Sequence, residues 1–138
     1  QMEESKMNTT VTWQPKYEIG VEKIDFEHKI FLTLIHEFEQ QIQSFPDPDL
    51  LLHRMEEIRK YAEFHFLSEE NVMMESHFSE FEIHRGFHQT LLQELNAKIH
   101  SVQSKAMKPE SLVEFIFEWF VVHTTQEDQR IAKHLSFK

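Results

Sequence analysis

The sequence predicts an all-α protein, an antiparallel up-down-up-down four-helix bundle with a non-helical N-terminal arm. Only 2 Gly and 4 Pro punctuate the 138 residues, which favours few, long helices over many short strands. A hydrophobic content of 40%, with 13 Phe, supports a real core in one domain. Along four segments apolar side chains recur at alternating steps of three and four residues, which is the pattern of helices packed side by side.

The N-terminal part of the chain should lie outside the helices. A polar tail leads into the aromatic segment from Trp13 to Tyr17, which contains Pro15, and Gly20 ends this arm. We therefore divide the chain into a tail and arm, residues 1–20, and one bundle domain, residues 21–138.

Turn signals bound the four predicted helices, which run over residues 21–44, 48–75, 80–104 and 108–125. Pro46 and Pro48 separate the first two helices, and Pro109 suits the first turn of the fourth. We expect only a short tail segment after Thr125. The short links imply that consecutive helices are antiparallel neighbours.

Charge and composition exclude several classes of partner. With 14 basic and 24 acidic side chains the formal charge is −10, which disfavours nucleic acid and anionic membrane surfaces. The chain has no Cys, so it has no disulfide, thiolate metal site or cysteine nucleophile. No apolar run approaches the ~20 residues that span a bilayer, and residues 1–10 lack the apolar stretch of a secretory signal. We expect a cytoplasmic protein.

Each predicted helix places at least one His in its apolar stripe, where an aliphatic side chain would pack better. The inward ionisable residues of these stripes are His28, His65, Glu69, His84, His88 and His123. One inward His is ordinarily explained by a hydrogen bond to a backbone carbonyl, but a set of this size would bury many polar groups without partners. Within the set, the two pairs spaced at i and i+4 each share one helix face. The pattern predicts that the side chains converge on metal.

Asp128 completes the set less cleanly. It follows His123 by five residues, which places it about 140° away around a regular helix. Both side chains reach one site only if the helix ends or loosens between them, and the β-branched Thr124 and Thr125 favour this. The remaining histidines fall off the stripes and are read as solvated or locally hydrogen-bonded; they are His36, His53, His77, His100 and His134.

The donor types limit which metals such a site would take, although ligand type alone does not distinguish iron from manganese. Five imidazoles and two carboxylates exceed what one tetrahedral zinc uses, and a chain without thiols cannot hold an iron–sulfur cluster. Mixed nitrogen and oxygen ligation suits iron, and carboxylates suit bridging between two ions. Because so few donors are anionic, high-valent iron would be poorly stabilised. The balance therefore favours reversible oxygen binding over oxidative chemistry.

Five motifs occur in order along the chain. They are W-x-P-x-Y-x-x-G (Trp13 to Gly20), D-x-x-H-K (Asp25 to Lys29), Y-x-x-x-H-F-x-x-E-E-x-x-M (Tyr61 to Met73), H-x-x-x-H (His84 to His88) and W-x-x-x-H-x-x-x-x-D (Trp119 to Asp128). Each is weak alone, but together and in register the sequence resembles the hemerythrin family, specifically the bacterial hemerythrins.

The resemblance implies a ligand set for two iron ions with an oxo or hydroxo bridge, and dioxygen as their ligand. It implies that one iron is held by His84, His88 and His123, the other by His28 and His65, with Glu69 and Asp128 bridging them. Dioxygen would bind at the iron held by two histidines. The irregular step to Asp128 belongs to the same family pattern.

Further roles follow from the resemblance. Phe64, Phe66 and Trp119 are candidates for an apolar wall of the pocket, while Trp13 and Tyr17 would pack structurally along the bundle surface. Glu70 should point away from the site as a solvated charge. Two positions depart from the family: His36 stands where Asn is frequent, and Thr124 where an apolar residue such as Ile is common. If Thr124 borders the pocket, its hydroxyl would admit water and speed autoxidation.

The expected function is reversible dioxygen binding by an oxygen carrier or store that is not an enzyme. An alternative is an oxygen- or redox-sensing domain that regulates an attached or partner signalling output. A di-iron oxidase, or an enzyme that handles peroxide or nitric oxide, is a third reading that the imidazole-rich ligand set disfavours.

Overall fold

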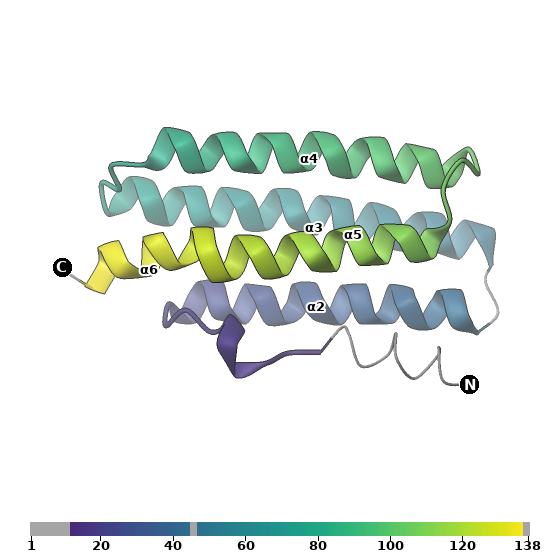
Figure 1. The fold of residues 1–138 in the computed structure, drawn as a ribbon, viewed down its shortest axis with the longest axis horizontal. Helices are drawn as coiled ribbons and strands as arrows, with labels where there is room; N and C mark the ends of the chain where they lie inside the picture. Colours follow the sequence, from purple (N-terminus) through teal and green to yellow (C-terminus); the bar gives the residue numbers. More distant parts are fainter. Residues whose placement is uncertain (1–11, 45–46, 137–138) are drawn as a thin grey trace.

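The computed structural model describes residues 12–44 and 47–136, so the polar tail expected before the arm lies mostly outside the described residues. Long helices lie side by side as a bundle (Figure 1). They are α2 (Glu22–Gln43), α3 (Pro48–Glu75), α4 (Phe81–Gln103), and a fourth rod made of α5 (Pro109–Val122), a π-helical turn (His123–Glu127) and α6 (Asp128–Ser136). Each helix contacts the next along the chain, and α5 also packs on α2. The predicted fold class is confirmed.

Local signals account for the starts of α3 and α5. The side chain of Asp47 caps α3 by accepting a hydrogen bond from the backbone N–H of Asp49 at 3.0 Å. Pro48 occupies the first turn of α3 and Pro109 the first turn of α5, where a missing backbone N–H removes no helical hydrogen bond. Both predicted starts are thus found in the structure.

The prediction of a short tail after Thr125 is wrong. The helix continues to Ser136, because a π-helical turn carries it through the two threonines. Ile131 on α6 is fully buried with Met73 and Phe78. His134 donates from Nε2 to the backbone carbonyl of Ser76 at 2.8 Å, which ties α6 to the end of α3.

The arm is anchored where it enters α2. Backbone N–H groups of Ile19 and Gly20 donate to the two carboxylate oxygens of Asp25, at 2.9 and 3.0 Å. Gly20 has a φ of +89°, a conformation that favours glycine, and it lets the chain turn into the helix. Asp25 thus fixes the arm against the first turn of α2.

Tyr17 lies deeper than predicted. It sits in a short 3₁₀ turn (Pro15–Tyr17) and is 1% exposed. Its ring meets the ring of Phe120 edge-on, with the two ring centroids 5.4 Å apart. The tyrosine is therefore a core residue rather than a surface contact. Trp13 packs against it, with the two ring centroids 5.6 Å apart. Both have the structural role that was expected.

The bundle has two different interiors. Apolar side chains such as Phe38, Met55, Ile58 and Leu112 fill the half nearer the link between α2 and α3. The other half holds the buried histidines and all the buried carboxylates of the described residues except Glu39. Among the described residues, none of the helices combines the length and apolar character that crossing a bilayer requires.

Candidate metal centre

All seven predicted ligand residues meet inside the bundle, and none is more than 4% exposed. Each of the four rods of the bundle contributes at least one: they are His28 from α2, His65 and Glu69 from α3, His84 and His88 from α4, His123 from the π turn and Asp128 from the start of α6. The five histidines read as off-stripe lie outside this cluster.

The cluster divides into two groups of residues. Within each group, one donor atom from every residue lies within 4.8 Å of the donor atoms of the others. One group is Glu69, His84, His88 and His123, and the other is His28, His65, Glu69 and Asp128. Glu69 belongs to both. Three histidines thus face one position and two face the other, which is the division that the resemblance implied.

Glu69 presents one carboxylate oxygen to each group. Its Oε1 lies 2.9 Å from Nε2 of His88, and its Oε2 lies 2.9 Å from Nε2 of His65. The two oxygens therefore point in the directions that a carboxylate bridging two cations requires.

Asp128 divides its oxygens in the same way. Its Oδ1 is 3.1 Å from Nε2 of His123 and 3.2 Å from Nε2 of His84, whereas its Oδ2 is 3.2 Å from Nε2 of His28. Both carboxylates thus lie between the three-histidine group and the two-histidine group.

The π turn is what brings Asp128 to the site. Its backbone N–H bonds to the carbonyl of His123, five residues back, instead of the residue four back. The extra residue in this turn cancels the angular offset of a five-residue step. The expected loosening between His123 and Asp128 is therefore confirmed, and it takes the form of a wider helical turn.

The donor atoms have few partners within the protein. Nε2 of His65, His84 and His123, Oε2 of Glu69 and both oxygens of Asp128 are buried without a hydrogen bond among the described residues. Buried polar atoms of this kind destabilise a protein unless something binds them. Imidazole nitrogens and carboxylate oxygens that converge in this way fit a pair of transition-metal cations.

When no cation is bound, the carboxylates and histidines of the cluster shift each other's pKa values. Burial alone would raise the pKa of Glu69 and Asp128, but the histidines around them outweigh it and hold both pKa values well below their usual range. Burial lowers the pKa of His65 and His123, but the adjacent carboxylates raise them to about 9 and about 10. Cations would replace these protons, since metal binding needs neutral imidazoles.

Glu27 is a functional residue that the sequence reading missed. Its Oε1 accepts a hydrogen bond from Nδ1 of His65 at 2.7 Å, and its Oε2 accepts one from the Ser68 hydroxyl at 2.8 Å. A carboxylate on the outer nitrogen of a histidine fixes the ring so that Nε2 faces the metal position. Its place directly before His28 gave no stripe signal, because adjacent helical residues point in different directions.

The prediction that Glu70 points away as a solvated charge is wrong. Its Oε2 lies 3.0 Å from Nδ1 of His88, and its side chain is only 15% exposed. Glu70 follows Glu69 by about 100° around α3, so it faces the outer side of the histidine whose inner side faces Glu69. The adjacent glutamates therefore hold His88 from opposite sides.

A cavity of about 10 Å³, close to the size of one water molecule, adjoins the two-histidine group. Its lining includes both His28 and His65, while His123 is the only member of the three-histidine group on it. Thr124 borders it, as the sequence hypothesis required. The other lining residues are Phe31, Ala62, Phe66, Trp119 and Phe120.

Two of the three predicted wall residues are found on this cavity. Phe66 and Trp119 line it, but Phe64 is 53% exposed on the outside of α3. The position of Phe64, one residue before His65, turns it about 100° away from the site.

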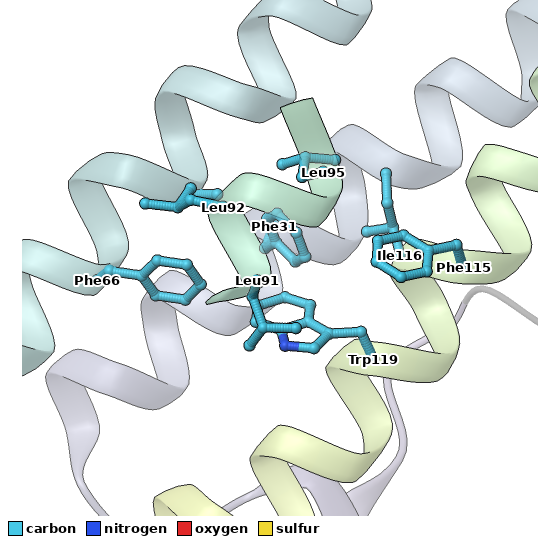
Figure 2. Close-up of a pocket in the computed structure, with 9 residues that line it drawn as sticks. Phe31, Phe66, Leu91, Leu92, Leu95, Phe115, Ile116 and Trp119 are labelled. Carbon is cyan, nitrogen blue, oxygen red and sulfur yellow. The ribbon is translucent and has the colours of Figure 1, made fainter. Parts of the chain in front are cut away.

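A second small cavity lies next to the first and shares four lining residues with it. Figure 2 shows its lining side chains, which include the shared Phe66 and Trp119 together with Leu91 and Leu92 of α4. Both leucines are half-buried. Side chains of α4 thus line apolar space that adjoins the cavity at the two-histidine group.

Comparisons with known proteins agree with this geometry. Residues 19–135 match the sequence profile of the Hemerythrin HHE cation binding domain. The chain is also 23% identical, over 124 residues, to a bacteriohemerythrin of Clostridium acetobutylicum, an alignment that covers 85% of this chain and 95% of that protein. The profile match includes all seven residues of the cluster.

Proposed function

Because the chain belongs to the hemerythrin family and carries two buried groups of histidines and carboxylates, we propose that it binds dioxygen reversibly at a pair of iron ions. His84, His88 and His123 would hold one ion, and His28 and His65 the other. Glu69 and Asp128 would bridge them, together with an oxo or hydroxo group. The protein would act as an oxygen carrier or store and not as an enzyme.

The uneven division of histidines supports this proposal most directly. Three imidazoles face one metal position, and only two face the position that adjoins the small cavity. A position with fewer protein donors beside an enclosed space is suited to an exchangeable small ligand. The predominance of neutral imidazoles over carboxylates supports binding over oxidation of a substrate.

The protein's own contribution is to orient donors and to keep water out. When bound, the iron pair supplies the electrons that make dioxygen binding strong. Glu27 and Glu70 hold His65 and His88 with Nε2 toward the centre. The aromatic rings of Phe66 and Trp119 enclose the cavity, which excludes solvent from the bound ligand.

A spectroscopic cycle tests the proposal. Iron-loaded protein is reduced without oxygen, and its visible spectrum is recorded when dioxygen is admitted and again when it is removed. We expect two irons per chain and an absorption band that appears and disappears with the gas. Direct, irreversible oxidation would overturn the carrier role in favour of a redox-sensing domain. Turnover of peroxide or nitric oxide well above that of free iron would favour an enzyme.

A matched pair of histidine variants on α3 controls the experiment. His65 is buried in the cluster, whereas His53 is exposed on the same helix. His65→Ala should lower the iron content and abolish the oxygen-dependent band. His53→Ala should behave like the parent protein. Equal behaviour of the two variants would contradict the ligand set.

A further inference from the structure

Thr124 carries a polar group that nothing in the protein uses. The residue is 1% exposed, it lines the cavity beside His28 and His65, and its hydroxyl has no hydrogen-bond partner among the described residues. A buried hydroxyl without a partner destabilises a fold. The arrangement therefore needs an explanation outside the packing of the bundle.

The neighbouring threonine shows that a partner was available in principle. Thr125 donates from its hydroxyl to the carbonyl of Val121, four residues back, at 2.6 Å, which is the usual way for a threonine to satisfy itself in a helix. Thr124 stands at the adjacent position of the same π turn and makes no such bond. Its hydroxyl remains available to a molecule in the cavity.

The surroundings of Thr124 give that hydroxyl particular weight. The wall also holds histidine rings and Trp119, whose indole N–H is likewise buried without a hydrogen-bond partner among the described residues. The rest of the wall is apolar, formed by Phe31, Ala62, Phe66 and Phe120. In an environment that excludes water, one hydrogen-bond donor discriminates strongly between ligands that can accept a hydrogen bond and ligands that cannot.

We propose that Thr124 is a specificity-determining residue of the ligand cavity, and that its hydroxyl donates a hydrogen bond to the small ligand held beside His28 and His65. The inference rests on the proposed iron site and names the class of ligand that the site favours. Ligands with an acceptor atom, small inorganic anions above all, bind more tightly than apolar molecules of the same size, since hydrogen bonds to charged acceptors are the stronger ones.

Azide is the probe for the first test. The oxidised, iron-loaded protein is titrated with azide and followed by visible absorption, with iron content measured for every variant. Thr124→Val keeps the shape and removes the donor, and it should weaken azide binding about tenfold, the effect of about 1.4 kcal/mol. Thr124→Ser keeps the donor and should bind nearly as the parent does. Thr125→Val, which removes the satisfied hydroxyl, should leave azide affinity unchanged.

A second measurement does not depend on metal. In metal-free protein, Thr124→Val should be at least as resistant to urea as the parent, because it replaces an unsatisfied hydroxyl by a methyl group. Thr125→Val should be less resistant, since it loses a formed hydrogen bond. A clear loss of stability in Thr124→Val would show a structural partner for the hydroxyl and overturn the proposal.

The two proposals fail in different ways. If azide binds Thr124→Val as tightly as the parent while dioxygen binding is reversible, the role of Thr124 is wrong and the carrier function stands. If azide affinity falls in the variant but the parent oxidises irreversibly, the carrier function is wrong and Thr124 keeps its role. Failure of the parent to take up iron would overturn both.

Discussion

At the scale of single residues, the histidines of the centre are held from outside as well as from within. Glu27 contacts the outer nitrogen of His65, and Glu70 that of His88. Such contacts fix the orientation of a ring before a cation arrives. The affinity of the centre for metal should therefore depend on residues that do not touch it.

Replacing Glu27 by Gln tests this dependence. The amide keeps the shape of the side chain but loses the charge that supports His65, so iron affinity should fall about 10- to 100-fold. Competition with a chelator of known affinity measures the change. Glu37→Gln on the same helix is the control, because Glu37 is exposed and pairs with Arg54 at the surface. Unchanged affinity in Glu27→Gln would show that the contact is incidental.

Glu39 is a second residue-scale feature, located in the apolar half of the bundle. It is fully buried, and neither of its oxygens has a hydrogen-bond partner among the described residues. Nδ1 of His36, one turn earlier on α2, lies 4.0 Å from Oε1 of Glu39. Burial raises the pKa of Glu39 to about 7.

The raised pKa of Glu39 makes a prediction about stability and pH. The folded state holds its proton up to about pH 7, whereas the unfolded chain releases it near 4.5. Stability contributed by the protonated form is thus lost as pH rises from 4.5 to 7. Glu39→Gln should be more stable than the parent by about 1–3 kcal/mol at pH 8, because a tenfold change in an acid constant is about 1.4 kcal/mol. Urea unfolding of the metal-free proteins should show this gain vanishing at pH 4, and a gain independent of pH would contradict the assignment.

The clustering of the candidate ligand residues could be predicted from the sequence, and the residues that support them could not. His28, His65 and Glu69 interrupt apolar stripes, so their inward direction was visible in the spacing. Glu27 and Glu70 lie outside the stripes and resemble ordinary surface charges. Only the packing of α2 on α3, and of α3 on α4, brings them onto the outer nitrogens of histidines from another helix.

At the scale of elements, the starts of α3 and α5 could be predicted from proline, whereas the continuation of the last helix through the π turn could not. Pro48 and Pro109 mark first turns in the sequence and in the structure. The stretch from His123 to Asp128 breaks the regular helical period, and a break in period resembles a helix end. A π turn and the end of a helix both interrupt the helical spacing of apolar residues, so the sequence pattern alone does not distinguish them.

The π turn should be sensitive to residue number rather than to residue type. Inserting one Ala after Thr125 adds a residue that the wider turn does not absorb, so it rotates Asp128 and Ile131 by about 100°. Iron content should then fall, and the free energy of unfolding should fall by about 3 kcal/mol or more, because a buried carboxylate and a core isoleucine are both displaced. Thr125→Ala, which keeps the count, should retain two irons per chain. Full iron loading of the insertion variant would show that the number of residues in the turn does not matter.

At the scale of the whole molecule, the two interiors of the bundle have different roles. The apolar half supplies stability that needs no ligand, through residues such as Phe38, Met55 and Leu112. The polar half is only fully satisfied when its donor atoms are bound. The fold should therefore persist without metal but gain stability from it.

Comparison of iron-loaded and metal-free protein tests this division. Far-ultraviolet circular dichroism should show similar helix content in both forms. The melting temperature should be on the order of 10 °C higher with iron, since a ligand held far above its Kd adds several kcal/mol to the folded state of a chain this size. A chelator should reverse the increase. Loss of helical signal on metal removal would show that the apolar half cannot fold alone.

The membership of Glu69 in both groups of donors has a consequence for populations of molecules. The first cation bears the cost of orienting and desolvating the Glu69 carboxylate. The second cation then binds to a carboxylate that is already in position, so it should bind more tightly. A sample given too little metal should thus consist mainly of empty and doubly loaded chains, with few half-loaded ones between them. Oxygen capacity would then be set by how many molecules are filled, and not by how well each molecule works.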